Sequence, residues 1–150
     1  GYAADAMKNM SDELGLGDKV TFVGCIHDRD LLKKYYAAAD LFLFPSLYDN
    51  APLVVREAAA LHTPAVMAKG STASAILTDG VNGFLVDNDP DEMAALLRSL
   101  SSDREKIRRV GLQASRTIVR SWEDCVDEVL RRYNELLSSR GLPLIEKIEE

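Results

Sequence analysis

The sequence predicts an α/β protein in which helices cover both faces of a mostly parallel sheet. Short apolar segments of about four residues alternate with longer segments of helical periodicity. The apolar segments are continuous instead of alternating with polar residues, which is typical of strands buried on both faces. The chain has 150 residues, 47% of them hydrophobic and 28% charged, enough for one domain with its own core. Together these features indicate a Rossmann-like three-layer α/β/α domain.

The first elements are expected before residue 45. Residues 5–14 have the apolar spacing of a helix, and glycines follow it. Residues 20–23 form a short apolar segment, predicted as a buried strand. Asp28 or Asp30 can cap a helix that runs to about residue 39. A second buried strand is expected at 41–44, where a proline ends it.

The remaining elements continue the alternation. A helix is predicted over 52–61, with Pro52 in its first turn. A strand is predicted at 65–68, a short helix near 72–78 and a fourth strand at 84–86 after two Gly-containing turns. Three helices are then expected, at about 90–100, 103–119 and 122–139.

The start of the chain does not match a complete sheet of this type. The sequence opens on a helix, and its sheet would have four strands, whereas a doubly wound sheet usually has a further strand at its centre. We therefore expect that this strand, and everything before it, lies outside these 150 residues.

Composition excludes several classes of protein. The net charge is −6 and no long basic block is present, which argues against a nucleic-acid partner. No apolar segment approaches the ~20 residues that span a bilayer. Cys25, Cys125 and the two histidines lack metal-ligand spacing, so we expect no metal site and reduced thiols. The expected localisation is cytoplasmic, with peripheral membrane association left open for the full-length protein.

Two acids flank the start of the helix that begins near Pro52. Asp49 lies just before this helix, and Glu57 lies roughly 7–8 Å further along its axis. The free N–H groups of the first turn and the helix dipole favour an anion there. Carboxylates accept hydrogen bonds from hydroxyl groups, so the pattern suits a nucleotide sugar, whose diphosphate has a sugar on each side. Alternatively, Asp49 and Asn50 only cap the helix, and Glu57 is a solvated residue beside Arg56.

Other candidate residues also follow predicted strands. His27 comes after the first strand and is either a ligand contact or a plain loop residue. Lys69, Ser71 and Thr72 follow the third strand. They are either a second contact for phosphate or sugar, or a simple helix cap.

Four phrases of the sequence resemble one family of enzymes. Residues 44–49 and 57–64 resemble the phrase F-P-S-x-x-E followed by E-A-x-A-x-G-x-P. Val20 to Gly24 resembles V-x-F-x-G, residues 32–40 resemble L-x-x-x-Y-x-x-A-D, and residues 79–86 resemble D-G-x-N-G-x-L-V. In this order the phrases resemble the C-terminal domain of family 4 retaining glycosyltransferases, also called glycosyl transferases group 1.

The resemblance implies a GT-B enzyme, built of two Rossmann-like domains that face each other across a cleft. The C-terminal domain would hold a nucleoside-diphosphate sugar. An N-terminal domain, absent from these residues, would hold a glycan or lipid-linked acceptor. Transfer of a hexose-type sugar would retain anomeric configuration and need neither metal nor cofactor. Catalytic roles would fall to Asp49, beside the transferred sugar, and Glu57, on the ribose. The donor-binding residues would be Ser46, Asn50, Ala51, Leu53, His27, Lys69, Ser71 and Thr72.

The chain departs from the family pattern at four positions. Asp49 replaces the usual Glu, Pro52 and His62 replace glycines, and Ala75 replaces an acid. These changes leave open an alternative, a degenerate non-catalytic module for binding or assembly. A basic pair that neutralises the leaving diphosphate would precede Gly1, so we expect this polypeptide alone to transfer no sugar. An exposed sheet edge could also make the chain associate with itself.

Overall fold

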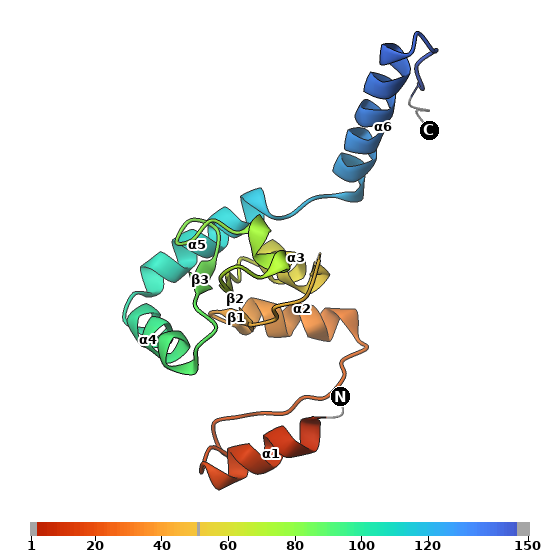
Figure 1. The fold of residues 1–150 in the computed structure, drawn as a ribbon. Helices are drawn as coiled ribbons and strands as arrows, with labels where there is room; N and C mark the ends of the chain where they lie inside the picture. Colours follow the sequence, from red (N-terminus) through yellow and green to blue (C-terminus); the bar gives the residue numbers. More distant parts are fainter. Residues whose placement is uncertain (1–2, 51, 147–150) are drawn as a thin grey trace. The chain divides into compact units, whose positions relative to one another are not determined.

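The computed structural model describes residues 3–50 and 52–146, which belong to two compact units, 1–35 and 36–150 (Figure 1). The first unit contains α1 (Ala4–Glu13) and most of α2 (Arg29–Ala38). The second contains β1 (Phe42–Phe44), α3 (Leu53–Ala60), β2 (Ala65–Ala68), η1 (Thr72–Ile76), β3 (Phe84–Val86), α4 (Pro90–Ser101), α5 (Arg104–Thr117) and α6 (Trp122–Ser139).

Both helices predicted in the first 40 residues are confirmed. Asp28 is the cap of α2, because its Oδ1 accepts the backbone N–H groups of Asp30 and Leu31 at 2.9 and 3.1 Å. The strand predicted at 20–23 is wrong, since these residues have no regular secondary structure. The backbone N–H of Val20, the first residue of this segment, donates to the carbonyl of Leu16 at 3.0 Å. A strand requires a hydrogen-bonded neighbour, and the apolar side chains of 20–23 do not supply one.

Among the described residues, three strands form one parallel sheet in the order β1-β2-β3. Phe44 pairs with Met67, and Ala68 pairs with Val86, so the carboxyl ends of all three strands lie at the same edge. Every residue of β2 is buried. The mostly parallel sheet predicted from continuous apolar segments is therefore confirmed.

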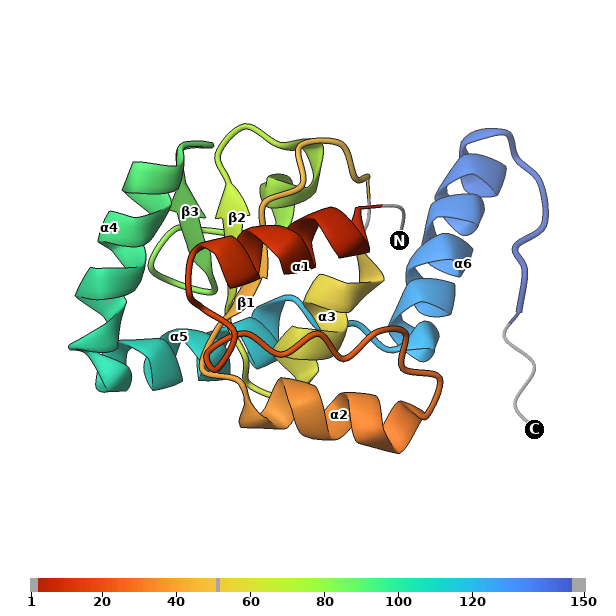
Figure 2. The same cartoon turned by 90° about the horizontal axis from the view of Figure 1, so that it is seen from below.

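Helices cover both faces of this sheet. One core cluster joins Ala65 and Met67 of β2 to residues of α3, η1 and α5. The other joins Val66 of β2 to Phe84 and Val86 of β3 and to residues of α4 and α5. Successive side chains of a strand point to opposite faces, so the two clusters lie on opposite sides of β2. In both views α4 lies beside β3 (Figures 1 and 2).

A tight backbone contact joins α5 to the turn between α3 and β2. His62, in that turn, has a φ of +64°, the left-handed region that favours glycine. Gly111 of α5 faces it, and a Cβ at this position would lie 2.0 Å from the carbonyl oxygen of His62. Only a glycine lets α5 approach the turn this closely. The glycine that the family pattern has at position 62 is thus replaced by a residue that keeps the glycine conformation.

Side chains cap the three helices that follow β3. Asp89 and Asp103 accept backbone N–H groups in the first turns of α4 and α5. Ser121 and Asp124 form a reciprocal capping box at the start of α6. Within residues 3–50 and 52–146, no helix has the length and apolar character needed to cross a membrane.

Candidate functional site

The candidate site lies at the edge of the sheet where the three strands end. The loop after β1 carries Ser46, Asp49 and Asn50, and the loop after β2 carries Lys69 and Ser71. Because the strands are parallel, these loops meet at one edge, where ligands of α/β proteins bind. Asn50 is exposed, whereas Ser46 and Asp49 are partly buried. Ala51, predicted as a donor contact, lies outside the described residues.

Thr72 holds the Asp49 loop in place. Its Oγ1 donates a hydrogen bond to the carbonyl oxygen of Asp49 at 2.8 Å and accepts one from the Asp49 N–H at 3.2 Å. These bonds connect residues 23 positions apart in the chain. The structure therefore brings Asp49 and Thr72 together, and the Thr72 hydroxyl acts on the Asp49 backbone.

Ser71 has the capping role that was one of its two interpretations. Its Oγ accepts the backbone N–H of Ser74 at 3.2 Å, and Ser74 Oγ donates to the Ser71 carbonyl at 2.8 Å. Both serines are buried. The hydroxyl of Ser71 is thus committed to the first turn of η1.

Lys69 pairs with an acid that the sequence did not single out. Its Nζ lies 3.4 Å from Oδ2 of Asp87, which directly follows β3. Both side chains are exposed, so the pair adds little to stability. The ion pair does, however, fix the position of the Lys69 ammonium group, which lies between the ends of β2 and β3. In the sequence, Asp87 could have been recognised as a candidate because it directly follows the strand predicted at 84–86.

The start of α3 differs slightly from the prediction. Pro52 is the N-cap residue, with a φ of −67° and ψ of 103°, and Leu53 is the first helical residue. Pro52 was expected inside the first turn. Proline has neither a capping side chain nor an N–H, so no side chain caps this helix. Leu53 is largely exposed.

Glu57 is oriented by contacts within the second unit. The hydroxyl of Tyr36 donates to Oε2 of Glu57 at 3.4 Å. Buried Thr63 in turn donates to the Tyr36 carbonyl at 2.6 Å. The Tyr36 ring also packs edge-on against Phe42 of β1, with centroids 5.6 Å apart.

These contacts correct the alternative in which Glu57 is a solvated residue beside Arg56. Glu57 is half-buried, and the guanidinium of Arg56 donates to the carbonyl of Ile118 instead. The part played by Tyr36 was missed, although the phrase L-x-x-x-Y-x-x-A-D contains this residue. A hydrogen bond between residues 21 positions apart leaves no local signal.

Two further features belong to other parts of the chain. His27 lies in the first unit, is exposed, and stays a prediction as a donor contact.

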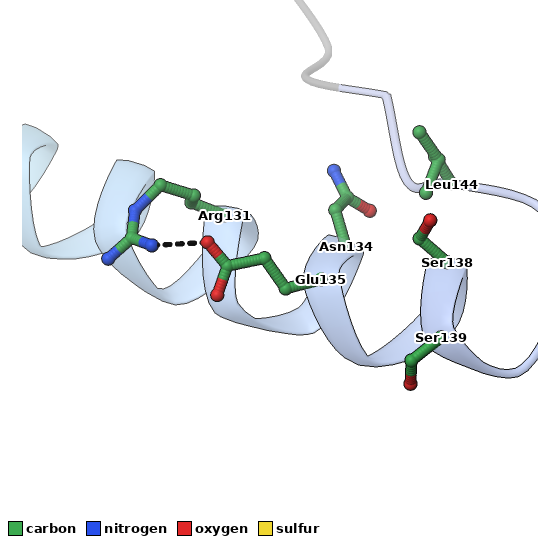
Figure 3. A pocket seen from close by; sticks show the side chains of 6 residues that line it. All are labelled: Arg131, Asn134, Glu135, Ser138, Ser139 and Leu144. Atoms are coloured by element: carbon green, nitrogen blue, oxygen red, sulfur yellow. Dashed lines mark hydrogen bonds and ion pairs between the residues drawn. The ribbon is translucent and has the colours of Figure 1, made fainter.

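A hollow at the end of α6 is lined by Arg131, Asn134 and Glu135 (Figure 3). Arg131 and Glu135 form an ion pair, and Asn134 makes two hydrogen bonds with the backbone of Ile145. These groups already have partners, so this hollow is a weaker candidate. Within the described residues, no group of three or more metal-ligating side chains occurs.

Comparison with known proteins identifies the family. Residues 1–117 match the family of glycosyl transferases group 1, and the chain belongs to this family. It is 35% identical over 136 residues to a D-inositol 3-phosphate glycosyltransferase of Mycolicibacterium vanbaalenii, covering 89% of this chain and 30% of that protein. A D-inositol 3-phosphate glycosyltransferase of Nocardia farcinica is 33% identical over 135 residues, with coverages of 89% and 30%. The chain thus spans about a third or less of the length of these relatives.

Solved structures show the same fold. Sucrose-phosphate synthase from Thermosynechococcus elongatus has a TM-score of 0.79 at 27% identity, over 93% of this chain and 35% of that chain. Anabaena HepE in complex with UDP has a TM-score of 0.70 at 27% identity, over 90% and 36%. The fold is therefore that of one domain of a GT-B glycosyltransferase.

Proposed function

We propose that this chain is the donor-binding half of a retaining glycosyltransferase. It would bind a nucleoside-diphosphate sugar, from which a hexose-type sugar passes to a saccharide or lipid-linked acceptor without a metal ion. The proposal is supported by hydrogen bonds to the two residues expected to contact the donor, one before α3 and one within it. Thr72 makes two hydrogen bonds with the backbone of Asp49, and the Tyr36 hydroxyl lies 3.4 Å from Oε2 of Glu57. The likeness to HepE, whose structure contains UDP, supports a nucleotide ligand.

Each acid would take one sugar ring of the donor. The diphosphate would lie at the first turn of α3, where backbone N–H groups and the helix dipole favour negative charge. Glu57 would accept hydrogen bonds from the ribose hydroxyls, and Asp49 from those of the transferred sugar. Asp49 is one methylene shorter than the glutamate of the family pattern, so its backbone must be well placed. The two hydrogen bonds between Thr72 and the Asp49 backbone would support that placement.

Catalysis would depend on positioning and on stabilisation of the departing diphosphate. The relatives are named for transfer involving D-inositol 3-phosphate, and this chain matches about a third or less of their length. We propose that the acceptor is held by residues outside these 150. We also propose that the 150-residue chain by itself transfers no sugar.

Nucleotide titration tests the donor site without requiring turnover. Thermal unfolding is followed with UDP, GDP and ADP, each at rising concentration. Saturation near 100 times the Kd stabilises by about 2.7 kcal/mol, which raises Tm by roughly 5–10 °C in a domain of this size. We expect one nucleotide to give such a shift.

Variants test whether the rise in Tm is caused by nucleotide binding at the candidate site. Glu57→Gln should reduce affinity for the stabilising nucleotide at least tenfold, and Tyr36→Phe should reduce it a few-fold. Glu105→Gln removes the same charge at an exposed position of α5 and should leave affinity unchanged. If no nucleotide stabilises the chain, the proposal is wrong and the non-catalytic module is the better interpretation. An effect of Glu105→Gln as large as that of Glu57→Gln would also reject the assigned site.

A further inference from the structure

A second hollow lies at the opposite edge of the sheet from the donor site. It has a volume of about 370 Å³ and is lined by Gly80, Val81, Arg109, Leu112, Gln113 and Arg116. Gly80 and Val81 belong to the turn that precedes β3, so they lie at the amino end of that strand. Asp49 and the residues tied to it follow the carboxyl ends. The hollow is therefore separate from the donor site.

The helix that lines this hollow concentrates positive charge. The segment Arg104–Thr117 contains five basic residues and one acidic residue, a net charge of +4. The whole chain has a net charge of −6, so the other residues together carry −10. Of the five basic residues, Arg109 and Arg116 line the hollow, so the hollow can attract an anionic partner.

Two arginines of the hollow are available for a ligand. Among the described residues, the guanidinium groups of Arg109 and Arg116 make no hydrogen bond or ion pair. By contrast, Arg104 on the same helix pairs with Asp40 at 3.2 Å. Both available arginines are exposed, and they lie two helical turns apart, about 10 Å along the axis.

Apolar side chains lie beside these cations. Val81 is 47% exposed and Leu112 is 42% exposed, and both line the hollow. Leu112 lies between Arg109 and Arg116 on the outer face of α5, whose inner face carries Val110 and Ala114. A surface that combines free guanidinium groups with exposed aliphatic side chains is suited to the boundary between lipid head groups and acyl chains.

We propose that this hollow and the outer face of α5 bind the phosphate head groups of an anionic phospholipid bilayer. Arg109 and Arg116 would each contact a head-group phosphate, and Val81 and Leu112 would enter the layer beneath. The backbone positions of the two arginines lie about 10 Å apart along the helix, which would let each arginine meet a different head group. The contact is peripheral, independent of the donor site, and sensitive to salt.

Vesicle binding tests the proposal. The protein is sedimented with vesicles of phosphatidylglycerol and phosphatidylcholine, and with vesicles of phosphatidylcholine alone. We expect binding to the anionic vesicles only. Each arginine near such a surface contributes about fivefold, so Arg109→Gln with Arg116→Gln should weaken partitioning roughly 30-fold. Leu112→Ser should weaken it further by a few-fold.

The matched control is Lys34→Gln with Arg140→Gln, which removes two charges at exposed positions outside the hollow. It should change partitioning less than twofold, and circular dichroism should show that all variants are folded. Equal losses in the two double variants would reject the hollow as the site. The proposal also fails if anionic vesicles do not bind the protein. It fails too if inorganic phosphate binds at Arg109 and Arg116 while vesicles do not, which would indicate a soluble anion.

Discussion

Replacement of Gly111 by alanine tests the packing that supports the candidate site. A Cβ at this position would lie 2.0 Å from the carbonyl oxygen of His62, 2.9 Å from its carbonyl carbon and 3.1 Å from Cδ of Pro64. The obstructing atoms belong to the backbone and a proline ring, so no side-chain rotation can relieve the overlap. To accommodate the methyl group, α5 must move away from the turn that joins α3 to β2.

The structure predicts the sign of the effect. In an exposed helix, alanine in place of glycine stabilises by about 1 kcal/mol. Overpacking in a well-packed region destabilises by about 1–3 kcal/mol, and a Cβ only 2.0 Å from a backbone oxygen belongs at the upper end. We therefore expect Gly111→Ala to lower the free energy of unfolding by about 2 kcal/mol.

Urea unfolding measures this change, and the Tm should fall by roughly 4–8 °C. Ser115→Ala, on the same helix, is the control and should change stability by less than about 0.5 kcal/mol. If Gly111→Ala stabilises the chain by about 1 kcal/mol, α5 does not approach this turn and the packing described above is wrong.

His62→Gly should stabilise the chain by about 1 kcal/mol, because it relieves the φ of +64°, and a lower urea midpoint would contradict this reason. Thr72→Ala should weaken nucleotide-sugar binding about fivefold in a thermal-shift titration, because it removes both hydrogen bonds to the Asp49 backbone. Thr72→Ser keeps the hydroxyl and should keep the affinity. Equal losses of affinity in the two variants would show that the hydroxyl does not position Asp49. Hydrogen bonds from Ser121 hold the pKa of Asp124 below its ordinary value of 3.8. The capping box should therefore stabilise α6 fully above pH 3.8 and lose this effect as the pH falls through the lowered pKa. Amide exchange in the first turn of α6 measures the loss, and Asp124→Ala should show it already at neutral pH.

The strands show what an apolar segment can and cannot predict. The segments at 41–44, 65–68 and 84–86 were recognised because strands buried on both faces are apolar throughout. Residues 20–23 have the same composition but form no strand. The apolar composition of a segment indicates that it will be buried. A strand also needs a hydrogen-bonding partner for its backbone, and that partner is distant in sequence.

The candidate site shows the same limit. That Asp49 and Thr72 lie at one edge followed from the rule that parallel strands end together. The bonds between Thr72 and the backbone of Asp49 could not be predicted, since they depend on the conformation of both loops. The same holds for Tyr36, whose hydrogen bond to Glu57 joins residues 21 positions apart in the chain.

The two proposed sites lie at opposite edges of one sheet, so we expect the donor and the bilayer to bind independently of each other. The donor is a soluble, highly charged molecule that must reach the carboxyl edge from water, whereas the basic face of α5 would meet the bilayer at the amino edge. A membrane bound there would leave the donor edge open. Vesicle-bound protein should therefore bind its nucleotide with the affinity of the free protein, as measured by titration with and without phosphatidylglycerol vesicles. Competition between vesicles and nucleotide would show that the two sites are not independent, because binding at independent sites leaves each affinity unchanged.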